Sequence, residues 1–217
     1  MPPDNAAQNA EWNGVQGQRW ATMKREIEGI LAPFGAAALE AAAPQPGERV
    51  IDIGCECGDT SIELARLVGV AGAVLGVDVS QPMLKVARAR GASERHSRLA
   101  FREADASEAR LPADNDLLHS RFGTMFFSQP SSAFSHMRKS LRAGGRCVFV
   151  CWRTPRDNAW AMTPLSAARE AIGITPAPTE PACRPRRPCQ PKRFDVDRIG
   201  LESRGRSCQR ECYGLAG

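Results

Sequence analysis

The chain has 217 residues, of which 42% are hydrophobic and 24% charged, a composition typical of a globular protein with one core. No apolar run reaches the roughly 18–20 residues that a membrane span needs, and the first ten residues lack the basic and apolar regions of a signal peptide. These features argue against a membrane protein, a collagen-like fibre and a wholly disordered chain. They predict a cytoplasmic protein with no membrane partner.

The formal net charge of +5 is concentrated near the C-terminal end. Residues 176–217 hold nine basic and five acidic residues, which leaves +4, and the preceding residues contribute the remaining +1. A basic end of this kind is either a solvated, disordered tail or a binding element for a polyanion such as nucleic acid. We favour the disordered tail and expect no nucleic-acid partner.

The cysteines divide equally between the body and the tail of the chain. The four in the body lie in apolar or glycine-rich segments, which indicates buried free thiols. A structural zinc site would need paired CxxC or Cys/His spacings, and these are absent from the sequence, so we predict no metal site. The eight residues are Cys55, Cys57, Cys147, Cys151, Cys183, Cys189, Cys208 and Cys212.

The N-terminal part of the chain predicts helix. Residues 19–43 carry apolar side chains at helical spacing, and Pro33 marks a break or kink within them. We therefore expect residues 1–43 to form a helical lead.

From residue 44 onward, apolar strands alternate with helices of about ten residues. The strands are expected at residues 49–53, 73–79, 99–103, 116–120 and 146–152. The helices are expected at residues 60–68, 80–90 and 132–142, the last of them ended by Gly144 and Gly145. This alternation is typical of βαβ units, so the fold class is α/β, with a doubly wound, mostly parallel sheet and helices on both faces.

The composition changes near Ile174. The last 42 residues contain six of the 16 prolines, and a stretch such as CRPRRPCQPKR builds neither a strand nor an amphipathic helix. Only residues 194–201 indicate a short ordered segment. We expect a domain at residues 44–174 and a Pro/Arg/Cys-rich, disordered tail at residues 175–217. The abrupt change also suggests that the tail is out-of-frame or otherwise aberrant sequence.

A glycine-rich segment, DIGCECG at residues 52–58, follows the first predicted strand. A glycine turn between a strand and a helix lets the backbone approach a ligand closely, and the helix N-terminus beyond it favours negative charge. The alternative is a tight turn that binds nothing.

Two carboxylates follow the next two predicted strands. Asp78 lies 20 residues beyond Gly58, where a carboxylate can accept hydrogen bonds from both hydroxyls of a ribose. Asp105 follows the third strand, where it could accept a hydrogen bond from an exocyclic amine. Each could be a solvated loop acid. Because ligands bind at the carboxyl edge of open α/β sheets, the glycine turn and the two acids together indicate a nucleoside site.

The spacing of the glycines differs from the GxGxxG pattern of nicotinamide-dependent enzymes. The segments RVIDIGCECGDTSIELA, AVLGVDVSQPMLKVARAR and FREADASEA resemble the first three motifs of the class I S-adenosylmethionine-dependent methyltransferases. The resemblance covers roughly residues 9–162 and is closest to the ubiquinone/menaquinone-biosynthesis group. It implies a Rossmann-like fold, S-adenosylmethionine as cofactor, and methyl transfer to a small-molecule acceptor.

The resemblance assigns the residues of the first motif to the methionine end of the cofactor. They are Asp52, Gly54, Glu56 and Gly58, of which the two glycines would admit the methionine part. Ser120, at the end of the fourth strand, would lie near the sulfonium.

The second and third motifs are assigned to the nucleoside. Asp78 would hold the ribose, Met83 would lie near the adenine, and Asp105 and Ala106 would face the adenine edge.

The chain departs from the family pattern in two places. Glu56 replaces the middle glycine of DxGxGxG, where a side chain could block the cofactor, turn outward or pair with the cofactor's ammonium group. From the sequence alone we expect weakened binding, so that Glu56→Gly would improve affinity. The second departure is that the two strands that normally complete the sheet after the fifth are missing or aberrant.

The pattern identifies no catalytic residue, but two candidates lie near the end of the fourth strand. His119 is either a general base or a core histidine, and Arg121 either orients a substrate or pairs with a local acid. Four apolar residues that follow either line a substrate pocket or belong to the core: Phe122, Met125, Phe126 and Phe127.

Three functions remain open at this point. The first is an active methyltransferase acting on a small, partly apolar molecule. The second is an inactive or truncated Rossmann-like remnant with weak or no cofactor binding. The third is a polyanion-binding module that uses the basic tail. The methyl acceptor and the oligomeric state are not predicted.

Overall fold

The core of the molecule is a six-stranded sheet in the order β3-β2-β1-β4-β5-β6. The computed structural model describes residues 5–94, 96–153, 158–173 and 194–195. The first five strands run parallel and β6 pairs antiparallel with β5. The strands are β1 (Arg49–Ile53), β2 (Ala73–Asp78), β3 (Leu99–Glu103), β4 (Asn115–Arg121), β5 (Leu141–Val150) and β6 (Phe194–Asp195).

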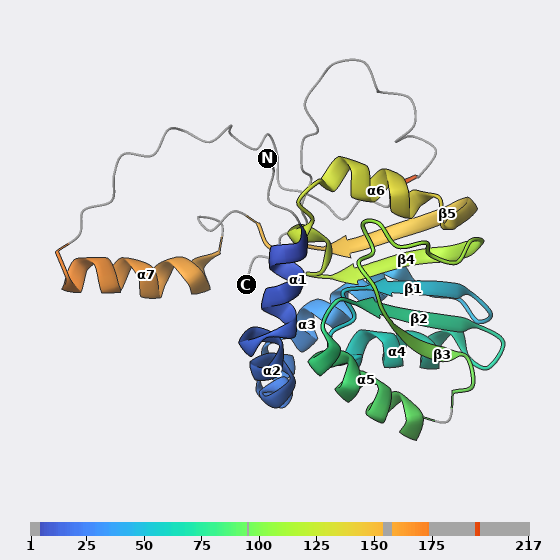
Figure 1. Ribbon diagram of the computed structural model, residues 1–217, viewed down its shortest axis with the longest axis horizontal. Helices are drawn as coiled ribbons and strands as arrows, with labels where there is room; N and C mark the ends of the chain where they lie inside the picture. Colours follow the sequence, from blue (N-terminus) through green and yellow to red (C-terminus); the bar gives the residue numbers. More distant parts are fainter. Residues whose placement is uncertain (1–4, 95, 154–157, 174–193, 196–217) are drawn as a thin grey trace, which may run out of the picture.

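Helices cover both faces of this sheet and also its carboxyl edge (Figure 1). Helices α3, α4 and α5 lie against one face and α6 against the other, while α1 and α2 lie across the ends toward which the strand arrows point. Helix α7 extends away from these layers. The helices are α1 (Asn5–Asn13), α2 (Val15–Thr22), α3 (Lys24–Ala42), α4 (Asp59–Val68), α5 (Gln81–Ser93), the 3-10 turn η1 (Thr124–Phe126), α6 (Pro130–Arg138) and α7 (Ala159–Ala171).

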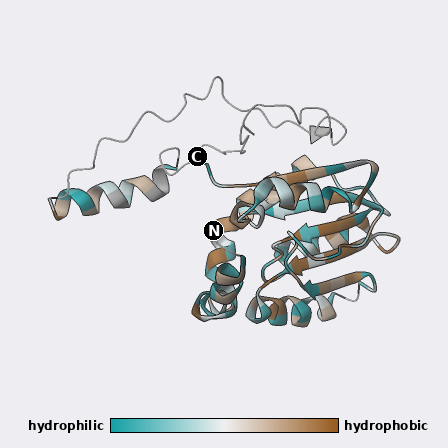
Figure 2. Cartoon of the chain, turned by 45° about the horizontal axis from the view of Figure 1, so that its top comes forward, coloured by the Kyte–Doolittle hydropathy of each residue, from teal (hydrophilic) through white to brown (hydrophobic). Residues whose placement is uncertain are grey.

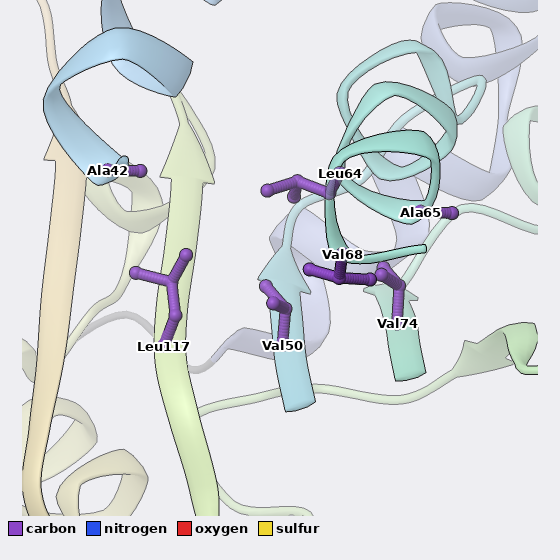
Figure 3. Close-up of a cluster of buried hydrophobic side chains, with 7 residues drawn as sticks. All are labelled: Ala42, Val50, Leu64, Ala65, Val68, Val74 and Leu117. Atoms are coloured by element: carbon purple, nitrogen blue, oxygen red, sulfur yellow. The ribbon is translucent and has the colours of Figure 1, made fainter. Parts of the chain in front are cut away.

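The central strands are buried on both faces, as their nearly continuous apolar sequences require. Much of the hydrophobic colouring in Figure 2 lies in these strands. Consecutive residues of a strand point to opposite faces, so Val50 packs toward α4 whereas Ile51 packs toward α6. Figure 3 shows the α4 side of the core, which consists of Ala42, Val50, Leu64, Ala65, Val68, Val74 and Leu117.

The predicted parallel α/β fold is confirmed, and two local predictions are wrong. Pro33 does not break the helix, because α3 continues on both sides of it, and the helical lead is instead interrupted at Met23, between α2 and α3. A proline inside a helix removes one N–H donor, and packing of α3 against β4 and β5 compensates for that loss.

The second correction concerns Gly144 and Gly145, which lie within β5 and do not end a helix. Helix α6 ends at Arg138. The β4–β5 register shifts between Asn115 and Leu117, and Gly144 has a φ of +73°. A glycine supplies the left-handed backbone that such an irregularity needs.

Part of the predicted tail can be compared with the structure. Phe194 and Asp195 of the expected ordered segment form β6, which pairs with Cys147 and Arg146 of β5. The antiparallel edge that the sequence did not predict is therefore present over two residues. The rest of residues 175–217, with the disorder, polyanion and reading-frame hypotheses, lies outside the described residues. None of the helices that the structure describes combines the length and hydropathy that crossing a membrane requires.

Truncation of the α4 side of the core tests this packing. Leu64 is fully buried, so Leu64→Ala should lower the free energy of unfolding by about 2–5 kcal/mol through lost burial and a residual cavity. Leu67, on the same helix, is 46% exposed, and Leu67→Ala should cost less than about 1 kcal/mol. Urea denaturation measures both values, and equal losses would contradict the described orientation of α4.

Candidate functional site

A cavity of about 540 Å³ lies at the carboxyl ends of the parallel strands, enclosed by residues of α1, α2 and α3. Its volume falls in the range of about 300–1,000 Å³ typical of small-molecule sites. Polar groups from the strand ends form one wall, and mostly apolar and aromatic side chains form the rest. The site therefore occupies the edge at which open α/β sheets bind ligands.

The glycine turn forms the floor of this cavity. Gly54 has a φ of +67° and lines the cavity, and a Cβ built on it would lie 2.7 Å from the Gly123 Cα. Only glycine fits such a close approach in the left-handed region. Gly58, with a φ of +85°, precedes α4 and faces Phe101, away from the cavity.

Asp78 lies at the end of β2 with its carboxylate in the cavity wall. Its Oδ1 accepts the Ser80 N–H at 2.9 Å, and its Oδ2 accepts the Glu56 N–H at 2.8 Å. Burial raises the pKa of Asp78 to about 6, against the effect of these hydrogen bonds. Each carboxylate oxygen keeps a further lone pair, so two ligand hydroxyls can bind.

Asp105 follows β3 and lines the same cavity, together with Met83 and Ala106. Its Oδ1 accepts the N–H and Oγ–H of Ser107 at 2.9 and 2.6 Å, and its Oδ2 accepts Asn5 Nδ2–H at 2.8 Å. Burial alone would raise the pKa of Asp105, but these hydrogen bonds hold it below its ordinary value. The structure thus brings together both predicted nucleoside carboxylates and the glycine turn.

Comparison with known proteins matches part of the chain to a family of domains. Residues 50–145 match the family profile described as "Methyltransferase domain". The chain carries a class I S-adenosylmethionine-dependent methyltransferase domain.

Individual relatives support the same domain. The chain is 26% identical over 149 residues to nocamycin O-methyltransferase of Saccharothrix syringae, covering 68% of this chain and 53% of the relative. It is 30% identical over 122 residues to the ubiquinone/menaquinone biosynthesis C-methyltransferase UbiE of Teredinibacter turnerae, covering 55% and 49%. It thus spans about half the length of these relatives.

The fold of this chain also resembles that of solved methyltransferases. A solved S-adenosylmethionine-dependent methyltransferase of Aquifex aeolicus superposes with a TM-score of 0.51 at 18% identity, covering 64% of this chain and 78% of that one. At this identity the likeness concerns the fold alone.

Asp52 opens the first motif of the methyltransferase domain but does not line the cavity. It is fully buried; Thr60 Oγ1 and Ser61 Oγ donate to its Oδ2 at 2.7 and 2.6 Å, and His119 Nδ1 donates to its Oδ1 at 2.8 Å. Burial alone would raise the pKa of Asp52, but these donors hold it below its ordinary value. Asp52 therefore ties β1 to α4 and β4 from inside the protein.

His119 and Ser120 are also buried behind the cavity wall and do not line it. The second ring nitrogen of His119, Nε2, is buried and has no hydrogen-bond partner among the described residues. The Ser120 hydroxyl donates to the Ile53 carbonyl at 2.7 Å and accepts the Gly123 N–H at 3.2 Å. The structure places His119 in the core, which is one of the two locations that the sequence left open. Ser120 is buried directly behind the cavity wall.

Arg121 is buried next to the glycine turn and pairs with acids from two elements. Its guanidinium donates to both Glu28 carboxylate oxygens, at 2.9 and 2.8 Å, and to Glu56 Oε2 at 3.3 Å. Of the two interpretations of Arg121, the structure therefore shows pairing with local acids. The Glu56 side chain points to Arg121 and leaves the cavity open.

The apolar wall contains all four residues for which the sequence left a pocket or core location open: Phe122, Met125, Phe126 and Phe127. Phe122 stacks on Trp152, with ring centroids 4.3 Å apart, and Phe34 meets both rings edge-on. Trp12 contacts Phe126 at 5.7 Å. Phe34 and Trp152 were not predicted, because they come from α3 and from the segment after β5, far from the motifs.

Three asparagines, which were not predicted from the sequence, hold helix α1 against the ends of the strands, and two of them, Asn5 and Asn9, line the cavity. Besides Asn5, Asn9 Nδ2 reaches Asp105 Oδ2 at 3.5 Å. Asn13 Nδ2 donates to the Val79 carbonyl at 2.7 Å. The sequence feature that could have predicted this contact is the four-residue spacing of the asparagines, which puts the three carboxamides on one face of the helix.

Within the described part of the chain, the ionisable side chains in the cavity wall are the carboxylates of Glu56, Asp78 and Asp105. No group of three or more His, Cys, Asp or Glu residues there is arranged to hold a metal ion. Among the described cysteines, Cys57 and Cys147 have pKa values that burial raises to about 12.

Removal of the Asn5 side chain tests the contact of α1 with Asp105. Asn5→Ala deletes three hydrogen bonds, with Asp105, Ser107 and the Ser128 N–H, each worth about 1 kcal/mol, so the amides of α1 should exchange with solvent at least about tenfold faster. Hydrogen exchange measured by mass spectrometry gives this rate. Glu11→Ala on the exposed side of α1 is the control and should leave it unchanged. Equal exchange in both variants would contradict a closing role for Asn5.

Proposed function

We propose that the domain transfers a methyl group from S-adenosylmethionine to a small-molecule acceptor. The observation that carries the proposal is the position of Asp78 and Asp105 at the tips of neighbouring strands, facing one cavity whose floor is the glycine turn. A nucleoside offers two ribose hydroxyls and an adenine amine as hydrogen-bond donors, and these two carboxylates supply acceptors for them.

The residues fit the cofactor at each end. Gly54 packs against the Gly123 backbone, which a Cβ would approach to 2.7 Å, and both glycines line the cavity, so the wall presents bare backbone to the methionine part. Asp78 would accept the ribose hydroxyls, and Met83 and Ala106 would contact the adenine. Asp105 would accept the adenine amine in place of its long contact with Asn9.

For methyl transfer, the protein then has mainly to position the acceptor beside the cofactor and to exclude water from the site. When bound, S-adenosylmethionine supplies the activated methyl group and the thioether leaving group. The aromatic wall around Phe122 and Trp152 would hold an apolar acceptor and exclude water. Because the described wall has carboxylates as its only ionisable groups, it suits an acceptor whose oxygen or carbon nucleophile loses its proton readily, such as a phenol or an enol.

The open cavity favours this function over an inactive remnant. A remnant was expected if the Glu56 side chain obstructed the site, but that side chain is paired with Arg121. With Glu56 in this position, the cavity still has a volume of about 540 Å³.

Isothermal titration of the full chain with S-adenosylmethionine tests the proposal. We expect micromolar binding that weakens about 10–100-fold in Asp78→Ala, because charge-assisted hydrogen bonds to the ribose are lost. Glu108→Ala, an exposed acid near Asp105, is the matched control and should bind as the unaltered chain does. Thermal melts of both variants establish that they are folded. An unaltered chain that binds no cofactor, or an Asp78→Ala variant that binds equally well, would refute the proposal.

A further inference from the structure

The charged side chains in the described cavity wall are all acidic. They are Glu56, Asp78 and Asp105, and no lysine or arginine accompanies them there. Asp78 and Asp105 have roles in binding the nucleoside. Glu56 lies in the glycine turn, beside the space assigned to the methionine part, and the proposed function does not use it.

The backbone fixes the place of Glu56. It has a φ of +52°, a left-handed conformation that a glutamate adopts at a cost, and its N–H donates to Asp78 Oδ2 at 2.8 Å. Its side chain is 19% exposed and lines the cavity. The carboxylate is therefore held at the junction of β1 and α4 and remains accessible from the cavity.

Arg121 only partly neutralises this carboxylate. It forms two short hydrogen bonds with Glu28, at 2.9 and 2.8 Å, but a single longer one with Glu56, at 3.3 Å. The three side chains together carry one negative charge more than positive when all are ionised. Within the described residues, the side-chain hydrogen bonds of Glu56 use Oε2 alone, so Oε1 is available to a donor from the cavity.

We propose that Glu56 binds the α-ammonium group of the cofactor's amino-acid tail, while Arg121, held by Glu28, keeps the carboxylate in position. The inference rests on the proposed function, because the ligand it recognises is the methionine part of S-adenosylmethionine. A primary ammonium offers three donors and a positive charge, which the excess negative charge at this turn complements. On this proposal Glu56 strengthens binding, which is the opposite of the effect expected from the sequence alone.

A proton should leave the site when the ammonium binds. Burial raises the pKa of Glu56 to about 7; Arg121 from β4 opposes this, and Asp78 from β2 and Glu28 from α3 add to it. Glu56 is therefore partly protonated at neutral pH in the free protein. A bound ammonium favours the ionised form, so affinity should increase as pH rises from about 6 to 7.5.

The experiment compares two nucleosides that share the adenosine and thioether groups. S-Adenosylhomocysteine carries the amino-acid tail, and 5′-methylthioadenosine lacks it. In Glu56→Gln, the dissociation constant of S-adenosylhomocysteine should rise about tenfold and lose its pH dependence, whereas that of 5′-methylthioadenosine should change less than about twofold. Glu63→Gln, an exposed acid on α4, is the control and should change neither value.

The outcomes separate the two proposals. A chain that binds neither nucleoside overturns the proposed function and this inference with it. If the chain binds both, three results overturn the inference alone: unchanged binding of S-adenosylhomocysteine in Glu56→Gln, equal losses for both nucleosides, or tighter binding of S-adenosylhomocysteine in Glu56→Gly.

Discussion

The turn between β1 and α4 is fixed by two buried carboxylates, one on each side, and the rest of the site depends on it. Asp52 holds the turn from inside the protein through Thr60, Ser61 and His119. Asp78 holds it from the neighbouring strand by accepting the Glu56 N–H. Between these anchors the backbone adopts left-handed conformations that place bare backbone at the cavity floor. Asp78 also lines the cavity, so the residue that stabilises the turn is the one that we propose binds the nucleoside.

Above this floor, the cavity combines an acidic end and an apolar end. The acidic end suits a cationic ligand, since a sulfonium and an ammonium each bring positive charge to carboxylates that burial leaves poorly solvated. The apolar end, built from Phe34, Phe122 and Trp152, suits an acceptor without charge. The relatives include both an O- and a C-methyltransferase, so likeness to this domain does not by itself specify the acceptor.

Sequence predicted those parts of the fold and site that depend on local composition. The five parallel strands follow from apolar runs, and Gly54, Asp78 and Asp105 follow from their places after those strands. Asp52 and Ser120, which the sequence assigned to the cofactor, are buried and do not line the cavity. Which side of the turn a side chain faces depends on partners distant in sequence, such as Thr60 and Ile53. The asparagine face of α1 was missed for the same reason, since its partners lie about 70 to 100 residues away.

The most direct test of the account is a crystal structure of this chain with S-adenosylhomocysteine. The account predicts that the ribose hydroxyls contact Asp78, that the adenine amine contacts Asp105, and that the amino group of the tail faces Glu56. A nucleoside bound outside this cavity, or bound within it with its ribose turned away from Asp78, would contradict the account.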